Sequence, residues 1–455
     1  MQSTSRRRFL QSTALSTLSL SQLNAFSAGK KPPNLLLILV DDMGYGDLGC
    51  YGAPDIATPN IDGLAREGVR LTQAYAFPVC TPTRCALMTG RYPARCPNLE
   101  WALYAGIDTT GLQPNQITIA KMLQHAGYHT GLMGKWHLGA RPEWAPNQHG
   151  FDEFFGILSG NVDHFKHIES TGQPDLFENT TPIQEEGYLT DLITERSVDF
   201  IKQNQDEPFF LYVAYNAPHW PIQGPDDKDK EIIPGENWIE NDRETYIEMV
   251  ERIDWGVGKI LKQLEDSGLN EETLVVFLSD NGGDRSSRNH PLSGQKGSLD
   301  EGGIRVPCIV RWPGEIPAGT ESQQPTIVMD LTVSLLHAAQ VNSPRPLEGI
   351  NILPYISGQR APIEQTFVWR DDMHDRAAVR WGDWKWLRQG EQEWLFHLKK
   401  DPQEQNDVKD EFFDIVYWMR DIYADWQAEM PYRQTLFGNE LRNISHPDEG
   451  AKKES

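Results

Sequence analysis

Continuous apolar runs alternate with amphipathic segments over the first three quarters of the chain. The apolar runs cover residues 34–40, 209–215 and 273–279, and the helix-like segments cover 118–126, 187–202 and 244–264, with a further helix opening at Thr58-Pro59. Strands that are apolar throughout are typical of a sheet buried on both faces. The pattern therefore predicts an α/β domain over residues 30–360, with a large mixed, mostly parallel sheet between helices.

The pattern changes from Gln365, which agrees with the expectation that the 427 residues after the N-terminal segment (455 less 28) exceed one core. Four short alternating segments, 366–370, 377–381, 384–387 and 393–398, are typical of antiparallel strands. Apolar and aromatic residues then recur at helical spacing over 410–429, a stripe we interpret as packing. We expect a small C-terminal α+β domain over 361–440 and a disordered tail over 441–455.

The N-terminal segment resembles a secretion signal. Arg6-Arg7-Arg8 precedes a Ser-, Leu- and Ala-rich stretch that runs to about Ala28. This order of basic, apolar and small residues is typical of a twin-arginine signal, whereas a chance Arg run in a disordered tail is the alternative. We expect export to the periplasm or the extracellular space. No later segment has the ~20 apolar residues of a membrane span.

Charge and cysteine content exclude two classes of protein. The formal net charge is −23, which argues against a nucleic-acid partner because binding to phosphates needs basic patches. The chain has five cysteines, too few for a disulfide scaffold. One or two bridges among Cys50, Cys85, Cys96 and Cys308 remain open.

Oxygen-bearing side chains follow two of the predicted buried strands. Asp41 and Asp42 follow the first, and Asp280 and Asn281 follow the run that ends at Ser279. Sites in open α/β sheets form at the carboxyl ends of strands, so these pairs can converge. Carboxylate and amide oxygens suit Ca²⁺ or Mg²⁺, whereas zinc would normally recruit His or Cys. Ordinary post-strand turns are the alternative.

The most informative motif is Cys80-Thr81-Pro82-Thr83-Arg84, which continues to Thr89-Gly90-Arg91. It resembles the signature of the formylglycine-dependent sulfatases of the alkaline-phosphatase-like superfamily, although members often carry Ser where this chain has Thr83. The resemblance covers about residues 32–408. It implies that a formylglycine-generating enzyme converts Cys80 to formylglycine, whose hydrate attacks the sulfate ester. A buried core thiol is the alternative for an isolated Cys.

Three further segments resemble the same family: Gly134-Lys135-Trp136-His137, Asn216-Ala217-Pro218-His219 and Gln295-Lys296-Gly297. The resemblance implies that the sulfate is surrounded by Arg84, Lys135, His137, His219 and Lys296. It also implies Ca²⁺, rather than Mg²⁺, held by Asp41, Asp42, Asp280, Asn281 and the modified Cys80. In the implied mechanism His219 protonates the leaving alcohol and His137 deprotonates the remaining hydroxyl.

Substrate candidates come from segments 156–164, 215–221 and 304–307, which look most like bacterial polysaccharide sulfatases, arylsulfatases and enzymes of galactosamine 6-sulfate type. We expect a sulfated oligo- or polysaccharide of galactose type. The candidate sugar-binding residues are Glu100, Trp101, His164 and His167, together with Asn98. A phosphate or phosphonate ester hydrolase with the same apparatus is one alternative. A catalytically silent binder of sulfated glycans, with Cys80 unmodified, is the other.

Overall fold

The computed structural model describes residues 31–104, 109–233, 236–238 and 241–431. The predicted secretion signal, 1–28, and the predicted tail, 441–455, lie outside these residues. Within the described ranges, no helix combines the length and the apolar character needed to cross a bilayer.

Eleven strands form the main sheet, and its centre is parallel. β1 (Asn34–Val40) lies between β7 (Phe209–Ala214) and β8 (Thr273–Ser279) and runs parallel to both. β3 (His129–Lys135) continues the parallel order beside β7, followed by β4 (Glu153–Ile157). The outer strands are β5 (Phe177–Glu178) and β6 (Thr181–Pro182) beyond β4, and β9 (Arg305–Arg311), β2 (Val69–Tyr75), β10 (Thr320–Ser322) and β11 (Thr326–Ile327) beyond β8. Because β9 is antiparallel to β8 and β2, the sheet is mixed but mostly parallel, as predicted.

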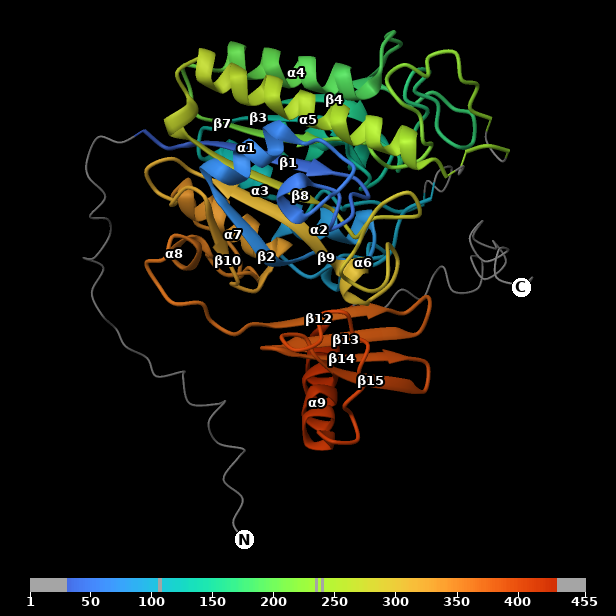
Figure 1. Ribbon diagram of the computed structural model, residues 1–455. Helices are drawn as coiled ribbons and strands as arrows, with labels where there is room; N and C mark the ends of the chain where they lie inside the picture. The colour runs from blue at the N-terminus through green and yellow to red at the C-terminus, as the bar shows by residue number, and fades with distance from the viewer. Residues whose placement is uncertain (1–30, 105–108, 234–235, 239–240, 432–455) are drawn as a thin grey trace. The chain divides into compact units, whose positions relative to one another are not determined.

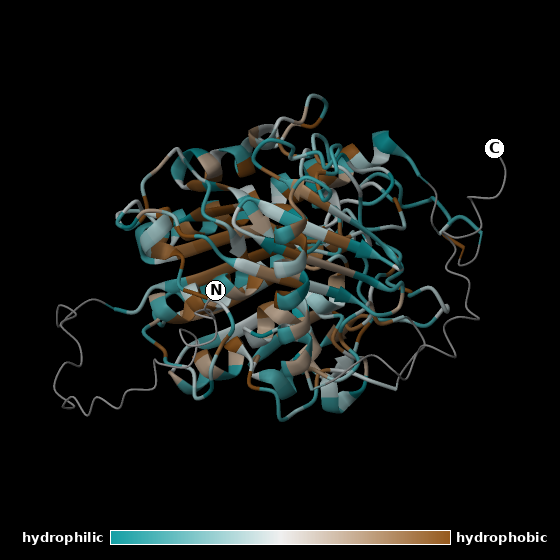
Figure 2. Ribbon diagram, turned by 90° about the horizontal axis from the view of Figure 1, so that it is seen from below, coloured by the Kyte–Doolittle hydropathy of each residue, from teal (hydrophilic) through white to brown (hydrophobic). Residues whose placement is uncertain are grey.

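Helices cover both faces of this sheet because its central strands are apolar on both sides. In β1, Leu35 and Leu37 belong to one core, whereas Leu36 and Ile38 belong to the other. The first core is covered by α2 (Cys80–Thr89), α3 (Ile119–His125) and α7 (Val328–Ala338), and the second by α1 (Pro59–Glu67), α4 (Leu189–Gln203) and α5 (Arg243–Asp266), as Figure 1 shows. Figure 2 shows the central strands as the hydrophobic part of this domain. Short helices lie at α6 (Glu301–Ile304) and α8 (Leu353–Ile356), and 3-10 turns lie at Gly49–Tyr51, Pro93–Arg95, Pro142–Trp144, Pro146–His149 and Asn270–Glu272.

The C-terminal part is a four-stranded antiparallel sheet with one helix, which confirms the predicted fold of this region. Its strands, in spatial and sequence order, are β12 (Thr366–Asp371), β13 (Arg376–Trp381), β14 (Trp384–Gln389) and β15 (Gln392–His397). One face packs against α9 (Phe413–Glu429), where Val416 and Met419 are buried. The other face carries Trp369, which joins the main core and donates a hydrogen bond from Nε1 to the Ala76 carbonyl at 2.8 Å. The aromatic stripe of α9 therefore serves packing, as its spacing predicts.

A buried ion network connects the small sheet to the main domain. The Lys385 ammonium on β14 lies 3.1 Å from Glu301 Oε1 and 2.7 Å from Glu404 Oε1, and all three side chains are excluded from solvent. The Glu301 carboxylate also accepts a hydrogen bond from Tyr75 Oη at 2.7 Å. Breaking a buried pair leaves an uncompensated charge, which costs far more than losing a surface pair.

We expect Lys385→Ala to lower the free energy of unfolding by about 3–5 kcal/mol, because Glu404 would stay buried without its cation and Glu301 would keep only Arg305, at 3.4 Å. The measurement is urea unfolding followed by fluorescence. Lys409→Ala is the matched control, since Lys409 pairs with Asp407 at the surface and its loss should leave the midpoint unchanged. Equal midpoints for the two variants would refute a structural role for the Lys385 network.

All five cysteines lie within the described residues and are free, so the structure contains none of the bridges left open above. Cys85 and Cys96 are both buried and hydrogen-bond to each other through their side chains. The bond lowers the pKa of Cys96, as the partner thiol stabilises its charge, whereas it raises that of Cys85. The pair packs as small apolar residues within the main core.

Candidate active site

The candidate residues converge at the carboxyl ends of four adjacent strands, β8, β1, β7 and β3. Asp41 and Asp42 follow β1, Asp280 and Asn281 follow β8, and Lys135 is the last residue of β3. Backbone hydrogen bonds from Asp280 N to Val40 O at 3.0 Å and from Asp41 N to Ala217 O at 3.3 Å keep the strand ends in register. The sheet topology thus brings together residues that are up to 240 positions apart, as expected for a site in an open α/β sheet.

Cys80 is the first residue of α2, after Val79 in extended conformation. The Thr83 hydroxyl accepts a hydrogen bond from Phe77 N at 2.9 Å and so closes the turn that precedes the helix. The Cys80 side chain is buried, and burial raises the pKa of its thiol to about 12 although Lys135 and Lys296 act to lower it. An unmodified Cys80 is therefore a neutral thiol, which is a weak nucleophile.

Each of the three carboxylates has a cation in contact. Arg84 donates to Asp280 Oδ2 from Nε at 3.1 Å and from Nη2 at 2.8 Å. Lys135 Nζ lies 2.5 Å from Asp41 Oδ2, and Lys296 Nζ lies 2.6 Å from Asp42 Oδ2. Burial and the neighbouring Asp280 nevertheless raise the pKa of Asp41 well above its ordinary value. These cations partly relieve the mutual repulsion of the three buried carboxylates.

The two histidines of the candidate site, His219 and His137, have fixed orientations. His219 Nδ1 donates to the Trp220 carbonyl at 2.7 Å, which leaves Nε2 to accept from Lys296 Nζ at 3.0 Å. His137 Nε2 donates to the Leu103 carbonyl at 2.7 Å, and its Nδ1 is buried without a hydrogen-bond partner. Burial, followed by the nearby lysines, lowers the pKa of both imidazoles well below the ordinary value, so both are neutral in this arrangement.

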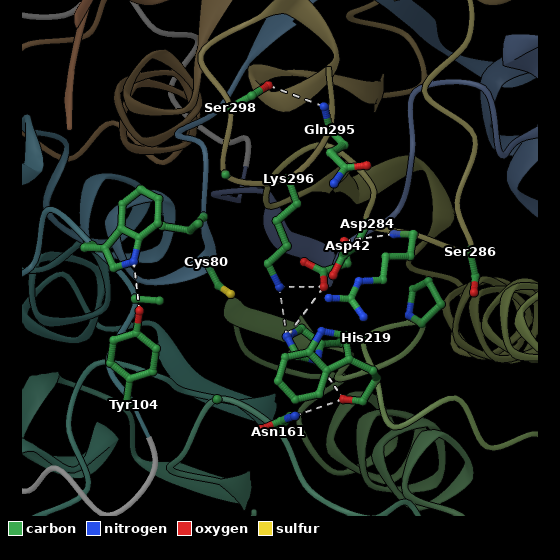
Figure 3. Close-up of a pocket in the computed structure, with 18 of the residues that line it drawn as sticks. Asp42, Cys80, Tyr104, Asn161, His219, Asp284, Ser286, Gln295, Lys296 and Ser298 are labelled. Atoms are coloured by element: carbon green, nitrogen blue, oxygen red, sulfur yellow. Dashed lines mark hydrogen bonds and ion pairs between the residues drawn. The ribbon is translucent and has the colours of Figure 1, made fainter. Parts of the chain in front are cut away.

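The residues of the candidate site lie at the wall of a pocket of about 1530 Å³ or directly behind it. Cys80, Asp42, His219 and Lys296 point into it (Figure 3). His137 also lines it. The remaining predicted site residues are fully buried and do not line the pocket: Asp41, Arg84, Lys135, Asp280 and Asn281. The pocket therefore exposes Cys80, Asp42, His137, His219 and Lys296, while the other predicted residues lie behind its wall.

Of the five predicted sugar-binding residues, Trp101 lines the pocket, whereas Asn98 and the other three do not. Glu100 is buried and forms a two-oxygen ion pair with Arg370, at 2.7 Å from Nη2 to each oxygen. His164 is buried and stacks on Tyr188 with ring centroids 5.4 Å apart. His167 is buried as well, and burial lowers its pKa. The structure does not bring these last three side chains to the pocket wall, because each is committed to packing or pairing elsewhere.

Several pocket residues were missed by sequence reasoning. Asn161 lines the pocket and donates from Nδ2 to the Trp220 carbonyl at 3.0 Å, the same oxygen that fixes His219. His374, in the turn between β12 and β13, and Arg376, the first residue of β13, reach the pocket from the small sheet. Asn161 lies within a segment that the family resemblance had singled out, so a signal existed for it. His374 and Arg376 carry no local signal, since only the packing of two sheets places them there.

The donor set fits a hard divalent cation. Asp41 Oδ1 and Asn281 Oδ1 are buried and accept no hydrogen bond in the structure, and both belong to the predicted ligand set. Another group of residues could also hold a metal ion. Within the described residues, the ligand atoms of Asp41, Asp42, Cys80 and His219 all lie within 4.8 Å of one another. A Cys–His set would favour zinc. The His219 Nε2 atom, however, already accepts from Lys296, and the two oxygens without a hydrogen bond belong to a carboxylate and an amide, which suit Ca²⁺.

Comparisons with known proteins agree with this geometry. The sulfatase family model matches residues 33–341, and the model for the C-terminal region of N-sulphoglucosamine sulphohydrolase matches residues 295–421. N-acetylgalactosamine-6-sulfatase of Canis lupus familiaris is 36% identical over 402 residues, 82% of this chain and 74% of that protein. Arylsulfatase A of Homo sapiens is 34% identical over 414 residues, 80% and 77% of the two chains.

Solved structures give the same result. The crystal structure of Ps i-CgsB superposes with a TM-score of 0.81 at 34% identity, covering 92% of this chain and 99% of that one. The complex of Ps i-CgsB with k-i-k-neocarrahexaose also has a TM-score of 0.81, at 33% identity. These similarities span the large sheet, the nucleophile motif and the small sheet together. This chain therefore belongs to the sulfatase family, whose members are sulfuric ester hydrolases.

Proposed function

We propose that this chain is an exported, formylglycine-dependent sulfatase that hydrolyses a sulfate ester of a galactose-type carbohydrate. The observation that carries the proposal is the placement of Cys80 at the inner end of the pocket, at the start of α2, beside His219, Lys296 and Asp42. Export rests on the twin-arginine pattern of residues 1–28, and maturation would require a formylglycine-generating enzyme.

The aldehyde hydrate at residue 80 supplies two hydroxyls on one carbon, so that one can attack sulfur and the other can later expel the sulfate. Lys296, which lines the pocket, and Lys135, once it is released from Asp41, stabilise charge that grows on the sulfate oxygens. His219 Nε2, 3.0 Å from Lys296 Nζ, protonates the departing alcohol. An anionic sulfate beside this imidazole favours its protonated form. His137 Nδ1, the unpaired nitrogen, accepts the proton of the remaining hydroxyl.

Asp41, Asp42, Asp280 and Asn281 would hold Ca²⁺, which supplies positive charge to polarise a sulfate oxygen. The structural support for this ligand set is that Asp41 Oδ1 and Asn281 Oδ1 are buried and accept no hydrogen bond. In this proposal Lys135 and Lys296 release part of their contact with the carboxylates when sulfate and cation are bound together. The lysines then face the substrate oxygens.

Chelation is expected to lower activity by about two orders of magnitude or more, because a catalytic cation contributes several kcal/mol. The melting temperature should fall only modestly, since lysines already pair with two of the carboxylates. Added Ca²⁺ should restore activity, whereas Zn²⁺ should not. Full activity after exhaustive chelation and dialysis, with no metal found by elemental analysis, would exclude the cation from the mechanism.

Two of the relatives support a carbohydrate substrate. N-acetylgalactosamine-6-sulfatase is named for an amino sugar of the galactose series, and Ps i-CgsB was solved with a neocarrahexaose. The pocket also carries Trp101, whose flat ring could stack on a sugar face. Together these features favour a sulfated galactose-type sugar over a sterol or a simple aryl ester.

The test is sulfate release from a panel of regioselectively sulfated mono- and oligosaccharides, with an aryl sulfate and an aryl phosphonate included. We expect turnover of galactose-type sulfates with the highest kcat/KM. Faster hydrolysis of the phosphonate than of every sulfate would instead identify a phosphonate ester hydrolase. Binding of sulfated sugars without any hydrolysis would identify a silent glycan binder.

A further inference from the structure

The active-site pocket is larger than one sulfated sugar requires, and it continues toward the small sheet. Its volume of about 1530 Å³ exceeds the roughly 300–1,000 Å³ that encloses a drug-sized ligand. A second pocket of about 420 Å³ shares Arg376 and Gln389 with it. The two pockets are therefore neighbours, with these two residues at their boundary.

The second pocket lies against the face of the small sheet that meets the main domain. Strand register places Leu387 of β14 opposite Trp394 of β15, and both line this pocket. The opposite wall comes from Leu299 and Asp300. These residues follow the loop that carries Lys296, which we call the Lys296 loop. Arg376 Nη1 donates to the Gly297 carbonyl at 2.9 Å and so ties the small sheet to that loop. A ligand in the second pocket would therefore contact residues that follow the catalytic lysine, Lys296, by three and four positions in the sequence.

The lining of the second pocket suits a neutral sugar better than an anion. Trp394 is half-buried and offers a flat apolar surface, while Gln389 and Gln405 are exposed amides. Three acids line it together with one cation, Arg376: Asp300, Asp407, which pairs with Lys409, and Glu404, which is held by the buried Lys385. The Arg376 guanidinium is itself paired with Asp371 at 3.2 Å, so it leaves little positive charge for a ligand. Carboxylates and amides bind sugar hydroxyls, whereas a sulfate would be repelled here.

We propose that the second pocket binds an unsulfated sugar unit of the same chain whose sulfated unit occupies the catalytic pocket. The substrate would then be an oligosaccharide with the target sulfate on one unit and a neutral unit further along, not a monosaccharide sulfate. The inference rests on the proposed function and specifies its substrate class. Residues of the small sheet, above all Trp394, become determinants of specificity for chain length.

The experiment compares kcat/KM on sulfated galactose with that on galactan di-, tetra- and hexasaccharides carrying a single sulfate. For the wild type we expect a rise from the monosaccharide to the longer chains. Trp394→Ala should lower kcat/KM on the tetrasaccharide by about tenfold, the typical effect of losing an aromatic anchor. Its kcat/KM on the monosaccharide should not change. A second sulfate on the distal unit should lower kcat/KM for the wild type.

Gln389→Ala provides a second variant that keeps the fold, because Gln389 is exposed, and it should also weaken the preference for long chains. Tyr417→Ala is the matched control: it removes an exposed aromatic from α9, which packs on the other face of the small sheet. Equal kcat/KM for all chain lengths in the wild type would overturn the inference while leaving the proposed function intact. Equal chain-length preference in the wild type, Trp394→Ala and Gln389→Ala would overturn it too. Absence of sulfate release from every substrate would instead refute the proposed function.

Discussion

Replacing Cys80 with Ala is expected to reduce sulfate release by more than about a thousandfold, because the covalent nucleophile is lost. The fold should persist, since Cys80 is the first residue of α2 and Ala is a good helix former of smaller volume. The measurement is kcat/KM on the best substrate of the panel, with circular dichroism and the melting temperature as checks on folding.

Cys85→Ala is the matched control for this variant. Cys85 lies one and a half turns further along α2, is fully buried and does not line the pocket. It should keep activity close to that of the wild type. If Cys80→Ala retains activity within about tenfold of the wild type, residue 80 does not supply the nucleophile.

His219→Ala is expected to lower the rate on a sugar sulfate by about 10² to 10⁴, the usual contribution of a general acid. The loss on an activated aryl sulfate should be clearly smaller, because a stabilised phenoxide leaves without protonation. The geometry supports this role, since Nδ1 is committed to the Trp220 carbonyl and Nε2 faces the pocket beside Lys296. Both rates are measured at saturating substrate and at one pH.

His125→Ala is the control here, because His125 is exposed at the end of α3 and does not line the pocket. It should change neither rate. Equal losses for His219→Ala on the sugar and aryl substrates would show that His219 binds sulfate without donating a proton. Lys296, at 3.0 Å from His219 Nε2, would then be the better candidate for the acid.

The apolar pattern predicted the central sheet well because strands buried on both faces leave a continuous signal in the sequence. The runs at 34–40 and 273–279 are β1 and β8 with the same bounds, and the residues after them converge as the topology rule requires. The small sheet and α9 were also recognisable from alternation and helical spacing. The family motif located Cys80, but the fixed orientation of His219 depends on the Trp220 carbonyl, which no motif reports.

The pocket wall was predicted poorly because it depends on contacts between distant segments. Glu100, adjacent to Trp101, was expected to approach the substrate, but Arg370 of β12 attracts its carboxylate into a buried pair. His164 was also expected to approach the substrate, but its ring is stacked on Tyr188. Conversely, Arg376 reaches the pocket only because the small sheet packs beside the Lys296 loop. Local sequence carries no record of such pairings.

The mass of the peptide that contains residue 80, taken from protein with measured sulfatase activity, tests the central claim most directly. The peptide is unambiguous because Cys80 and Cys85 flank Arg84 and separate on tryptic cleavage. The proposed mechanism predicts an aldehyde in place of the Cys80 thiol, in a fraction that rises in proportion to specific activity across preparations. Full specific activity in a preparation whose Cys80 is entirely thiol would contradict it.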